Sequence, residues 1–163
     1  MYDIKNIPTP YQGPNQLVKP EWIDHNGHMN VAFYLMAFDE SISDLFNYLD
    51  LTRAYRKQNQ IATYCGDFHI RYIRELFEGA PLRIINQVVG CDEKRIHLCQ
   101  SMYHGVDGYL AAQSEIMYLH ISLQTKRVSP MGADLFNRVE AMRDAHACLQ
   151  KPESQGRVIG SRR

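Results

Sequence analysis

The clearest pattern of hydrophobic and polar positions begins at Val31 and continues for about five helical turns. Apolar side chains recur there at steps of three and four residues, and polar side chains fill the opposite face. The apolar positions are Leu35, Phe38, Ile42, Leu45, Phe46 and Leu49. The pattern predicts a long helix with Asn30 as its N-cap. Residues 31–38 are apolar nearly all round, which predicts that other structure surrounds the first two turns.

The pattern changes to alternation in the second half of the chain. Tyr64, Phe68, Ile70 and Tyr72 alternate with polar side chains, which is typical of a half-buried strand. Strands are predicted at 61–74, 82–91, 95–103 and 109–121. Short segments of turn composition separate them, so consecutive strands are expected to pair antiparallel.

The two ends of the chain add smaller elements. Residues 1–15 contain three prolines and predict an extended arm, after which Leu17, Val18 and Trp22 suggest a short strand. Residues 132–150 predict a second amphipathic helix, and residues 151–163 a short, polar, mobile tail. A long helix followed by a strand meander indicates the α+β class, with the main domain at 16–131.

Composition narrows the function classes. A chain of 163 residues that is 45% hydrophobic can bury the core of one domain. Lys plus Arg and Asp plus Glu balance at 18 each, so no overall charge favours nucleic acid or a membrane surface. No apolar run approaches the ~18 residues of a membrane span, and residues 1–5 lack the features of a secretory signal. We therefore expect a cytoplasmic protein.

Cysteine and histidine spacing predicts neither a disulfide framework nor a metal site. The cysteines have no CxxC pair and are expected to be free thiols, mostly buried. They are Cys65, Cys91, Cys99 and Cys148. His25 and His28 are three residues apart, but no further ligand completes a set in the sequence. Turn and capping roles are the simpler interpretation, so no metal is expected.

The densest chemistry lies in residues 22–30, directly before the long helix. Asp24 stands beside a helix start, where unpaired backbone N–H groups can polarise a carbonyl that a carboxylate or an activated water attacks. This arrangement suits acyl transfer. Asp, Asn and Gly also gather before helices simply to form a turn. Because Asn30 already provides the cap, Asp24 is not needed for that purpose.

The same segment resembles a known family. Asp24-His25-Asn26-Gly27-His28-Met29-Asn30 is similar to the Asp-x-x-Gly-His-x-Asn signature of the 4-hydroxybenzoyl-CoA thioesterase-like branch of hot-dog-fold acyl-CoA thioesterases. Further similarity follows in the family's order at 69–74, 108–115 and 126–127. The resemblance covers roughly residues 16–131.

The resemblance implies an antiparallel sheet wrapped around the long helix, and a homodimer or dimer of dimers with sites between subunits. It places the catalytic carboxylate on Asp24, as nucleophile or general base, and the carbonyl-polarising amide on Val31. His28 and Asn30 would shape the turn and orient Asp24, with a direct catalytic role also open. The implied substrate is an acyl-CoA, with no other cofactor. Candidate substrate-binding residues are Gly27, Met29, Tyr34, Phe68, Arg71 and Arg74, the two arginines being candidates for the CoA phosphates.

Two departures and two alternatives qualify this interpretation. Glu75 stands where relatives often have Pro, and Ala80 where an Asp is common. A hot-dog hydratase of enoyl thioesters would also use an Asp and a His, but with a Pro-containing motif and a different spacing. A non-catalytic acyl-CoA binding module is the other alternative, against which the intact Asp24 argues. The acyl group is not specified by these patterns.

Overall fold

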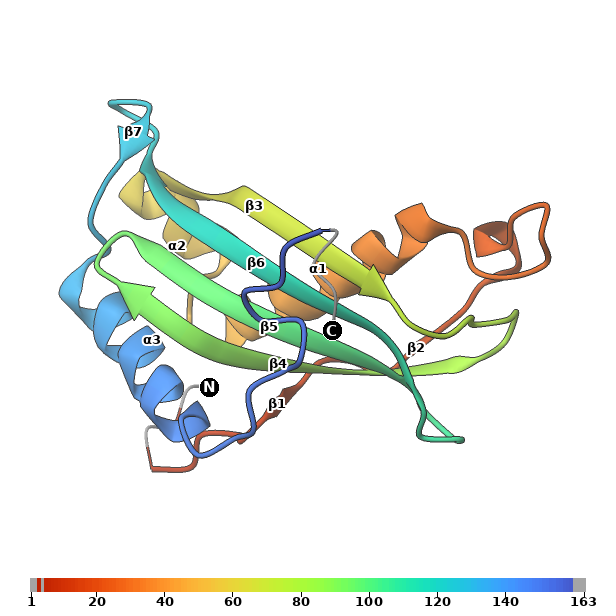
Figure 1. Cartoon of the computed structure of the whole chain (residues 1–163). Coiled ribbons are helices and arrows are strands. Elements are labelled where there is room, and N and C mark those ends of the chain that lie inside the picture. The colour runs from red at the N-terminus through yellow and green to blue at the C-terminus, as the bar shows by residue number, and fades with distance from the viewer. Residues whose placement is uncertain (1–2, 4, 160–163) are drawn as a thin grey trace.

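A computed structural model describes residue 3 and residues 5–159. The remaining positions, which belong to the predicted arm and tail, lie outside the described residues. Four long strands form the body of one antiparallel sheet, in the order β4-β5-β6-β3 (Figure 1). They are β3 (Ile61–Tyr72), β4 (Pro81–Asp92), β5 (Arg95–His104) and β6 (Leu110–Ser122). Each matches a predicted strand to within about two residues, the usual uncertainty of an element's end.

Short strands extend the sheet. β1 (Tyr11–Gln12) and β2 (Gln16–Leu17) pair with β4, and β7 (Arg127–Val128) pairs with β6. The predicted arm therefore contains a short edge strand. The expectation of one strand through Leu17, Val18 and Trp22 is wrong, because Pro20 starts a 3-10 helix, η1 (Pro20–Trp22). Proline fixes its own φ and suits the first position of a helix, which explains the change of structure there.

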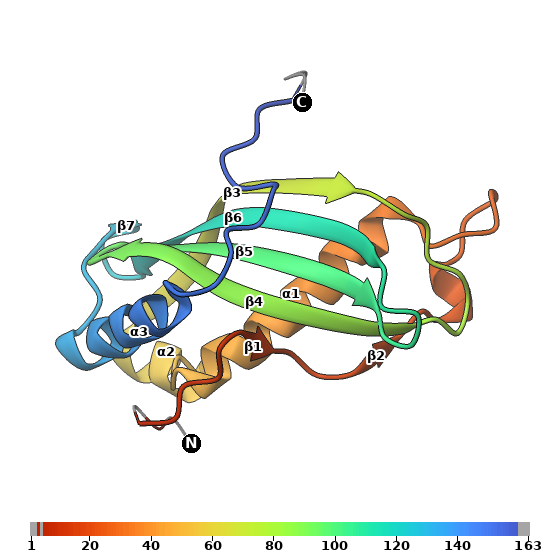
Figure 2. The ribbon, with the colours of Figure 1, turned by 60° about the horizontal axis from the view of Figure 1, so that its bottom comes forward.

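The long helix α1 (Val31–Tyr48) crosses one face of the sheet (Figure 2). The Asn30 side chain accepts a hydrogen bond from Ala32 N–H at 2.9 Å, so the predicted cap is confirmed. The apolar side of α1 is buried, and Phe38 at its centre is fully enclosed. Truncating such a side chain to alanine typically costs about 3–5 kcal/mol of stability.

A buried polar row divides the core between α1 and the sheet. Asn86 Nδ2 donates to Ser41 Oγ at 2.8 Å, and Gln100 Nε2 donates to Asn86 Oδ1 at 2.8 Å. Ser114 Oγ donates to Gln100 Oε1, also at 2.8 Å. One apolar cluster lies on each side of this row along the strands, and the cluster that contains Trp22 and Met29 supports the start of α1. Buried polar groups need such partners, so the row fixes how α1 sits on the sheet.

The start of α1 is less covered than its sequence predicts. Val31, Leu35 and Met36 remain exposed, so the described chain does not wrap the first two turns by itself. The second half of α1 shares an apolar cluster with α3 (Ala133–His146), the predicted C-terminal helix, which lies beside β4. A further short helix, α2 (Arg53–Asn59), has no predicted counterpart, because none of its side chains is buried and it carries no apolar stripe.

The described part of the tail crosses the sheet face opposite α1 (Figures 1 and 2). We call this side the outer face. Ser154 is buried there, and Gly156 N–H donates a 2.7 Å hydrogen bond to Glu115 Oε2 on β6. The tail thus has a defined docking position, while its mobility stays a prediction. Among the described residues no helix combines the length and apolar character needed to cross a bilayer.

Candidate active site

The residues around Asp24 form a tight turn that local sequence explains. Asp24 N–H donates to the His28 carbonyl at 3.0 Å, and Gly27 N–H donates to the Asp24 carbonyl at 3.0 Å. Gly27 has a φ of 82°, a left-handed conformation that glycine adopts without steric cost. Ile23 and Met29, on either side of the turn, form an isolated antiparallel β-bridge. Gly27 therefore shapes the turn.

Backbone hydrogen bonds tie this turn to its surroundings. Met29 N–H donates to the Leu76 carbonyl at 2.7 Å, and Asn30 N–H donates to the Trp22 carbonyl at 2.9 Å. Met29 is buried in the core, while Asn30 caps α1. The turn is consequently held both to the loop after β3 and to the start of α1, which positions Asp24 on a rigid support.

The Asp24 carboxylate is stabilised as an anion. The hydrogen bond from Asn26 N–H, at 2.8 Å from Oδ1, is the main cause that holds the pKa of Asp24 below its ordinary value. His28 and His25 act in the same direction, and partial desolvation opposes them. An ionised carboxylate at neutral pH is the form that can act as a nucleophile or general base.

His28 lies between two carboxylates. Its Nδ1 is 4.0 Å from Asp24 Oδ1, and its Nε2 is 3.6 Å from Glu75 Oε1. The imidazole therefore lies between the predicted catalytic carboxylate of Asp24 and Glu75, a residue on the loop after β3. Glu75, noted in the sequence only as a departure from the family pattern, carries a largely exposed side chain. No local sequence signal could have shown that it faces His28.

The first helical amide of α1 is available to a ligand. Asn30 occupies the Ala32 N–H, and Phe33 N–H donates to the Asn30 carbonyl at 3.0 Å. In the part of the chain that the structure describes, no group accepts a hydrogen bond from Val31 N–H. A free N–H at a helix N-terminus carries partial positive charge and can stabilise a developing oxyanion.

A cavity of about 230 Å³ opens at the start of α1. Its lining comprises His28, Met29, Val31, Tyr34, Tyr72, Ile73, Arg74 and Glu75. The rings of Tyr34 and Tyr72 meet edge to face, with centroids 5.1 Å apart. Burial raises the pKa of Tyr34 to about 12, so its phenol stays neutral near pH 7. The cavity brings together predicted site residues from the turn, α1 and the end of β3.

Of the remaining predicted substrate-binding residues, Arg74 lines the cavity, whereas Phe68 and Arg71 lie elsewhere on the sheet. Phe68 packs into both apolar clusters beneath the sheet and is absent from the cavity lining. Arg71 is on the outer face, where Nη1 pairs with Glu153 of the tail at 3.5 Å, so it is not brought together with Asp24. Arg74 lines the cavity, and its guanidinium stacks 3.9 Å above the ring of Tyr109. Of the two arginines, only Arg74 borders the cavity.

A larger cavity, of about 780 Å³, lies over β2 and the start of β4. Its lining includes Trp22, which directly precedes the turn, and also Lys19, Glu40 and Arg83. Asp24, His28 and Val31 are not part of its lining. His28 and Val31 line the smaller cavity, whereas Asp24 lines neither cavity and lies beside the smaller one through His28, whose Nδ1 is 4.0 Å from Asp24 Oδ1. We place the candidate chemistry at the smaller cavity because of these residues and not because of its volume.

The cysteines differ from expectation in burial. All four are free, as predicted, but only Cys99 is buried, while Cys65 and Cys148 are exposed. Exposure follows from their places on the edge strand β3 and at the end of α3. On the outer face Cys99 lies close to His97 and Glu115, a grouping the sequence reasoning missed. The signal was present, since positions two apart on a strand share a face.

Comparison with known proteins gives consistent findings. A family model described as the thioesterase-like superfamily matches residues 18–139. A betainyl-CoA thioesterase from Pseudomonas aeruginosa is 36% identical over 157 residues, which covers 96% of this chain and 97% of that protein. An L-carnitine dehydrogenase/betainyl-CoA thioesterase from Rhizobium meliloti is 30% identical over 155 residues. That match covers 93% of this chain and 31% of the relative, so this chain spans about a third of it.

The fold has a close structural counterpart. A hypothetical protein from Staphylococcus aureus, solved in complex with CoA, superposes with a TM-score of 0.89. The match covers 96% of this chain and 98% of that chain at 24% identity, a level at which the likeness shows the fold alone. The family match and this superposition confirm the predicted hot-dog fold.

Proposed function

Because this chain belongs to the thioesterase-like superfamily, we propose that it hydrolyses a CoA thioester whose acyl group is small and carries a quaternary ammonium. The family match and the similarity to a named thioesterase assign the chain to the thioester hydrolases. Betainyl-CoA, named for the Pseudomonas relative that is similar over nearly the whole chain, represents the proposed substrate class.

The proposal rests on Tyr34, Tyr72 and Glu75, which line the same small cavity. A quaternary ammonium has no N–H to donate, so proteins recognise it by aromatic rings and by nearby negative charge. The small cavity offers both, since its lining includes the edge-to-face pair of Tyr34 and Tyr72 and also the largely exposed Glu75.

Asp24 and Val31 supply the proposed chemistry. In one route the Asp24 carboxylate attacks the thioester carbonyl, CoA leaves as a thiolate, and water hydrolyses the resulting acyl anhydride. In the other, Asp24 takes a proton from a water that attacks the carbonyl directly, and CoA leaves as a thiolate when the tetrahedral intermediate collapses to the free acid. In both routes the Val31 N–H stabilises the oxyanion. His28 would orient the carboxylate, as its position between Asp24 and Glu75 supports.

A second copy of the chain is part of the proposal. Val31, Leu35, Tyr72 and Ile73 leave apolar surface exposed beside the cavity, and β3 is an edge strand. Exposed apolar surface next to an unpaired strand edge favours association. We expect a homodimer, or a dimer of dimers, that covers this surface and completes the site. Arg74, at the cavity border, is the candidate for a CoA phosphate.

The test compares betainyl-CoA with tert-butylacetyl-CoA, its uncharged analogue of nearly the same shape, in a thiol-release assay. The proposal expects kcat/KM for betainyl-CoA to be higher by about 5- to 30-fold, the range of one cation–π contact. Glu75→Gln should reduce this ratio and leave hydrolysis of the uncharged analogue nearly unchanged. Equal values for the two substrates would refute cation recognition, and no hydrolysis of any acyl-CoA would refute the enzymatic assignment.

A further inference from the structure

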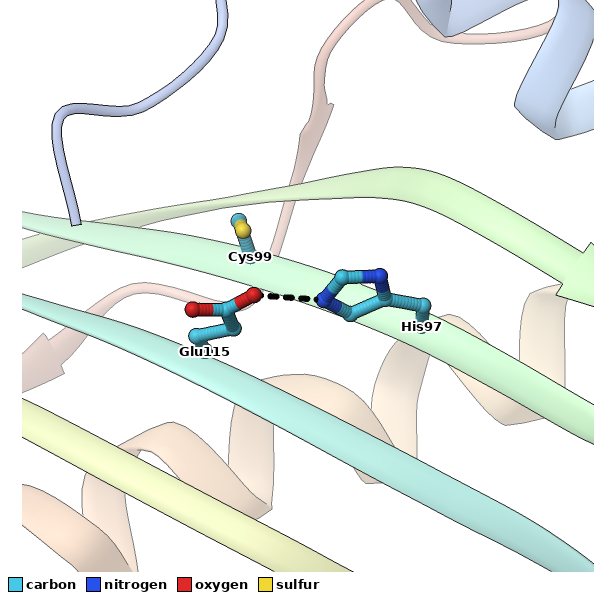
Figure 3. A group of neighbouring side chains, drawn as sticks. All are labelled: His97, Cys99 and Glu115. Atoms are coloured by element: carbon cyan, nitrogen blue, oxygen red, sulfur yellow. Dashed lines mark hydrogen bonds and ion pairs between the residues drawn. The ribbon is translucent and has the colours of Figure 1, made fainter. Parts of the chain in front are cut away.

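Three potential metal-binding side chains converge on the outer face of the sheet (Figure 3). His97 and Cys99 come from β5, and Glu115 comes from β6. Their ligand atoms all lie within 4.8 Å of one another. Glu115 is the register partner of Cys99, and His97 Nε2 is 2.7 Å from Glu115 Oε1. The sheet itself therefore sets the spacing of the three groups.

This cluster is separate from the candidate active site. Gln100, between the two apolar clusters, points toward α1 and donates to the Phe38 carbonyl at 3.1 Å. Side chains alternate along a strand, so Cys99 points away from α1. The tail contacts the cluster, because Gly156 N–H donates to the second oxygen of Glu115 at 2.7 Å. An adjoining cavity of about 340 Å³ is lined by His97 and Glu115 and also by His69, Asp67 and Arg157.

A cysteine–histidine–glutamate grouping could also suggest a nucleophile with its base, but the geometry opposes that role. Cys99 has no exposed surface. Burial, with the nearby charge of Glu115, raises the pKa of its thiol to about 12, so the nucleophilic thiolate is not populated near pH 7.

We propose that His97, Cys99 and Glu115 form a zinc-binding site on the outer face of the sheet. The set offers one nitrogen, one sulfur and one oxygen, all of which are ordinary zinc ligands. The charges of two anionic ligands and a neutral imidazole would balance the double positive charge of the ion, which favours a poorly exposed location. On binding, the thiol loses its proton to solvent, and the ring proton of His97 moves by exchange with solvent from Nε2 to Nδ1, which frees the Nε2 lone pair for the metal.

The distances need only small adjustments. Zinc bonds of about 2.0–2.3 Å in a tetrahedron place ligand atoms about 3.3–3.8 Å apart. His97 and Glu115 would separate slightly, and Cys99 would approach them. Gly90, the register partner of His97 on β4, has no side chain to hold the ring in place. The Gly156 hydrogen bond can remain on Glu115 Oε2, and a water from the adjoining cavity fills the fourth position.

The experiment measures zinc binding by the full chain, first stripped with a chelator. Zinc affinity is determined by competition with a chromophoric chelator, and cobalt is used as a spectroscopic probe. We expect one zinc per chain, a cobalt–thiolate charge-transfer band, and a rise in Tm on zinc addition. Cys99→Ser and His97→Gln should each weaken zinc binding by about 100-fold or more, beyond what loss of a merely supporting group costs.

The controls separate a built site from incidental binding. Cys65→Ser and Cys148→Ser alter exposed thiols outside the cluster and should bind zinc like the unaltered chain. Circular dichroism checks that each variant is folded, and His97→Gln, at a partly exposed position, serves if Cys99→Ser is unstable. Zinc affinity that is the same in the unaltered chain and in folded His97→Gln would overturn the proposal, as would a cobalt spectrum without the thiolate band.

Discussion

The hydroxyl of Tyr72 donates a 3.2 Å hydrogen bond to the backbone carbonyl of Val31. This contact joins the end of β3 to the first turn of α1, two segments about forty residues apart in the sequence. It places an aromatic ring beside the amide that we expect to stabilise the oxyanion. The ring proposed to recognise the acyl group and the amide proposed to polarise the carbonyl are therefore adjacent in the site.

The first prediction separates the ring of Tyr72 from its hydroxyl. Tyr72→Phe keeps the ring and loses only a hydrogen bond within the protein, which contributes about 0.5–1.5 kcal/mol to folding stability. Because the ring that faces the substrate is kept, KM for betainyl-CoA should stay within about threefold. Tyr72→Leu removes the aromatic face and should raise that KM by about 5- to 30-fold. Neither variant should change KM for tert-butylacetyl-CoA by as much. Steady-state kinetics on both substrates checks this, and an equal rise for both would indicate a general packing role.

The main elements were predictable because their patterns are local. The apolar spacing from Val31 and the cap at Asn30 located α1, and alternation located the four long strands. α2 was missed because it buries no side chain, and the polar row through Asn86 and Gln100 was missed because buried polar residues interrupt the alternation that the prediction uses.

The candidate site was predictable only in part, for a similar reason. The turn, the helix start and Asp24 are neighbours in the sequence. Glu75 and Tyr72 lie beside the start of α1 only because the chain folds, and no pattern along the sequence predicts that they are close to it. Arg71 illustrates the converse, since it lies only three residues before Arg74 but its side chain is on the outer face of β3, while Arg74 follows the end of the strand and lines the cavity.

The second prediction concerns pH. The carboxylate is the active form of Asp24, and its pKa lies below the ordinary value of 3.8. Protonation of Asp24 therefore should not reduce kcat/KM until the pH falls below about 4, and any stability its charge contributes is lost only in that acid range. Rates measured over short exposures to acid check this. An acid limb centred above about pH 5 that persists in His28→Gln would contradict it.

The third prediction is that the protein is an obligate dimer or dimer of dimers. The exposed apolar side chains at the start of α1 and the edge of β3 should be covered by a second copy. Light scattering coupled to size exclusion should give at least twice the 18.9 kDa mass of one chain. A folded, monodisperse monomer at micromolar concentration would refute the prediction.

The fourth prediction is that turnover needs no metal. Asp24, His28 and Val31 provide the proposed chemistry, and the proposed zinc site is on the other face of the sheet. Dialysis against a chelator should leave kcat unchanged, while a zinc-dependent part of Tm should be lost. Activity that disappears on chelation and returns with zinc would show that the metal acts in catalysis.

The last prediction assigns the chemistry to Asp24. Asn keeps the size of Asp and much of its hydrogen bonding, but lacks the negative charge and the basicity. Asp24→Asn should therefore fold, associate and bind acyl-CoA, yet release thiol more slowly by roughly a hundredfold or more, the scale of losing one positioned catalytic group. Thiol-release kinetics, calorimetric binding of betainyl-CoA and thermal unfolding measure the three properties separately.

Glu75→Gln is the matched control, because Glu75 is the other carboxylate beside His28 and is far more exposed than Asp24. It should affect the preference for the cationic substrate and leave turnover of tert-butylacetyl-CoA within a few-fold. If Asp24 only shaped the turn, Asp24→Asn would lower stability in step with any loss of rate. Near-normal turnover by a well-folded Asp24→Asn protein, with contaminating thioesterase excluded, would remove Asp24 from the mechanism and favour the acyl-CoA binding module.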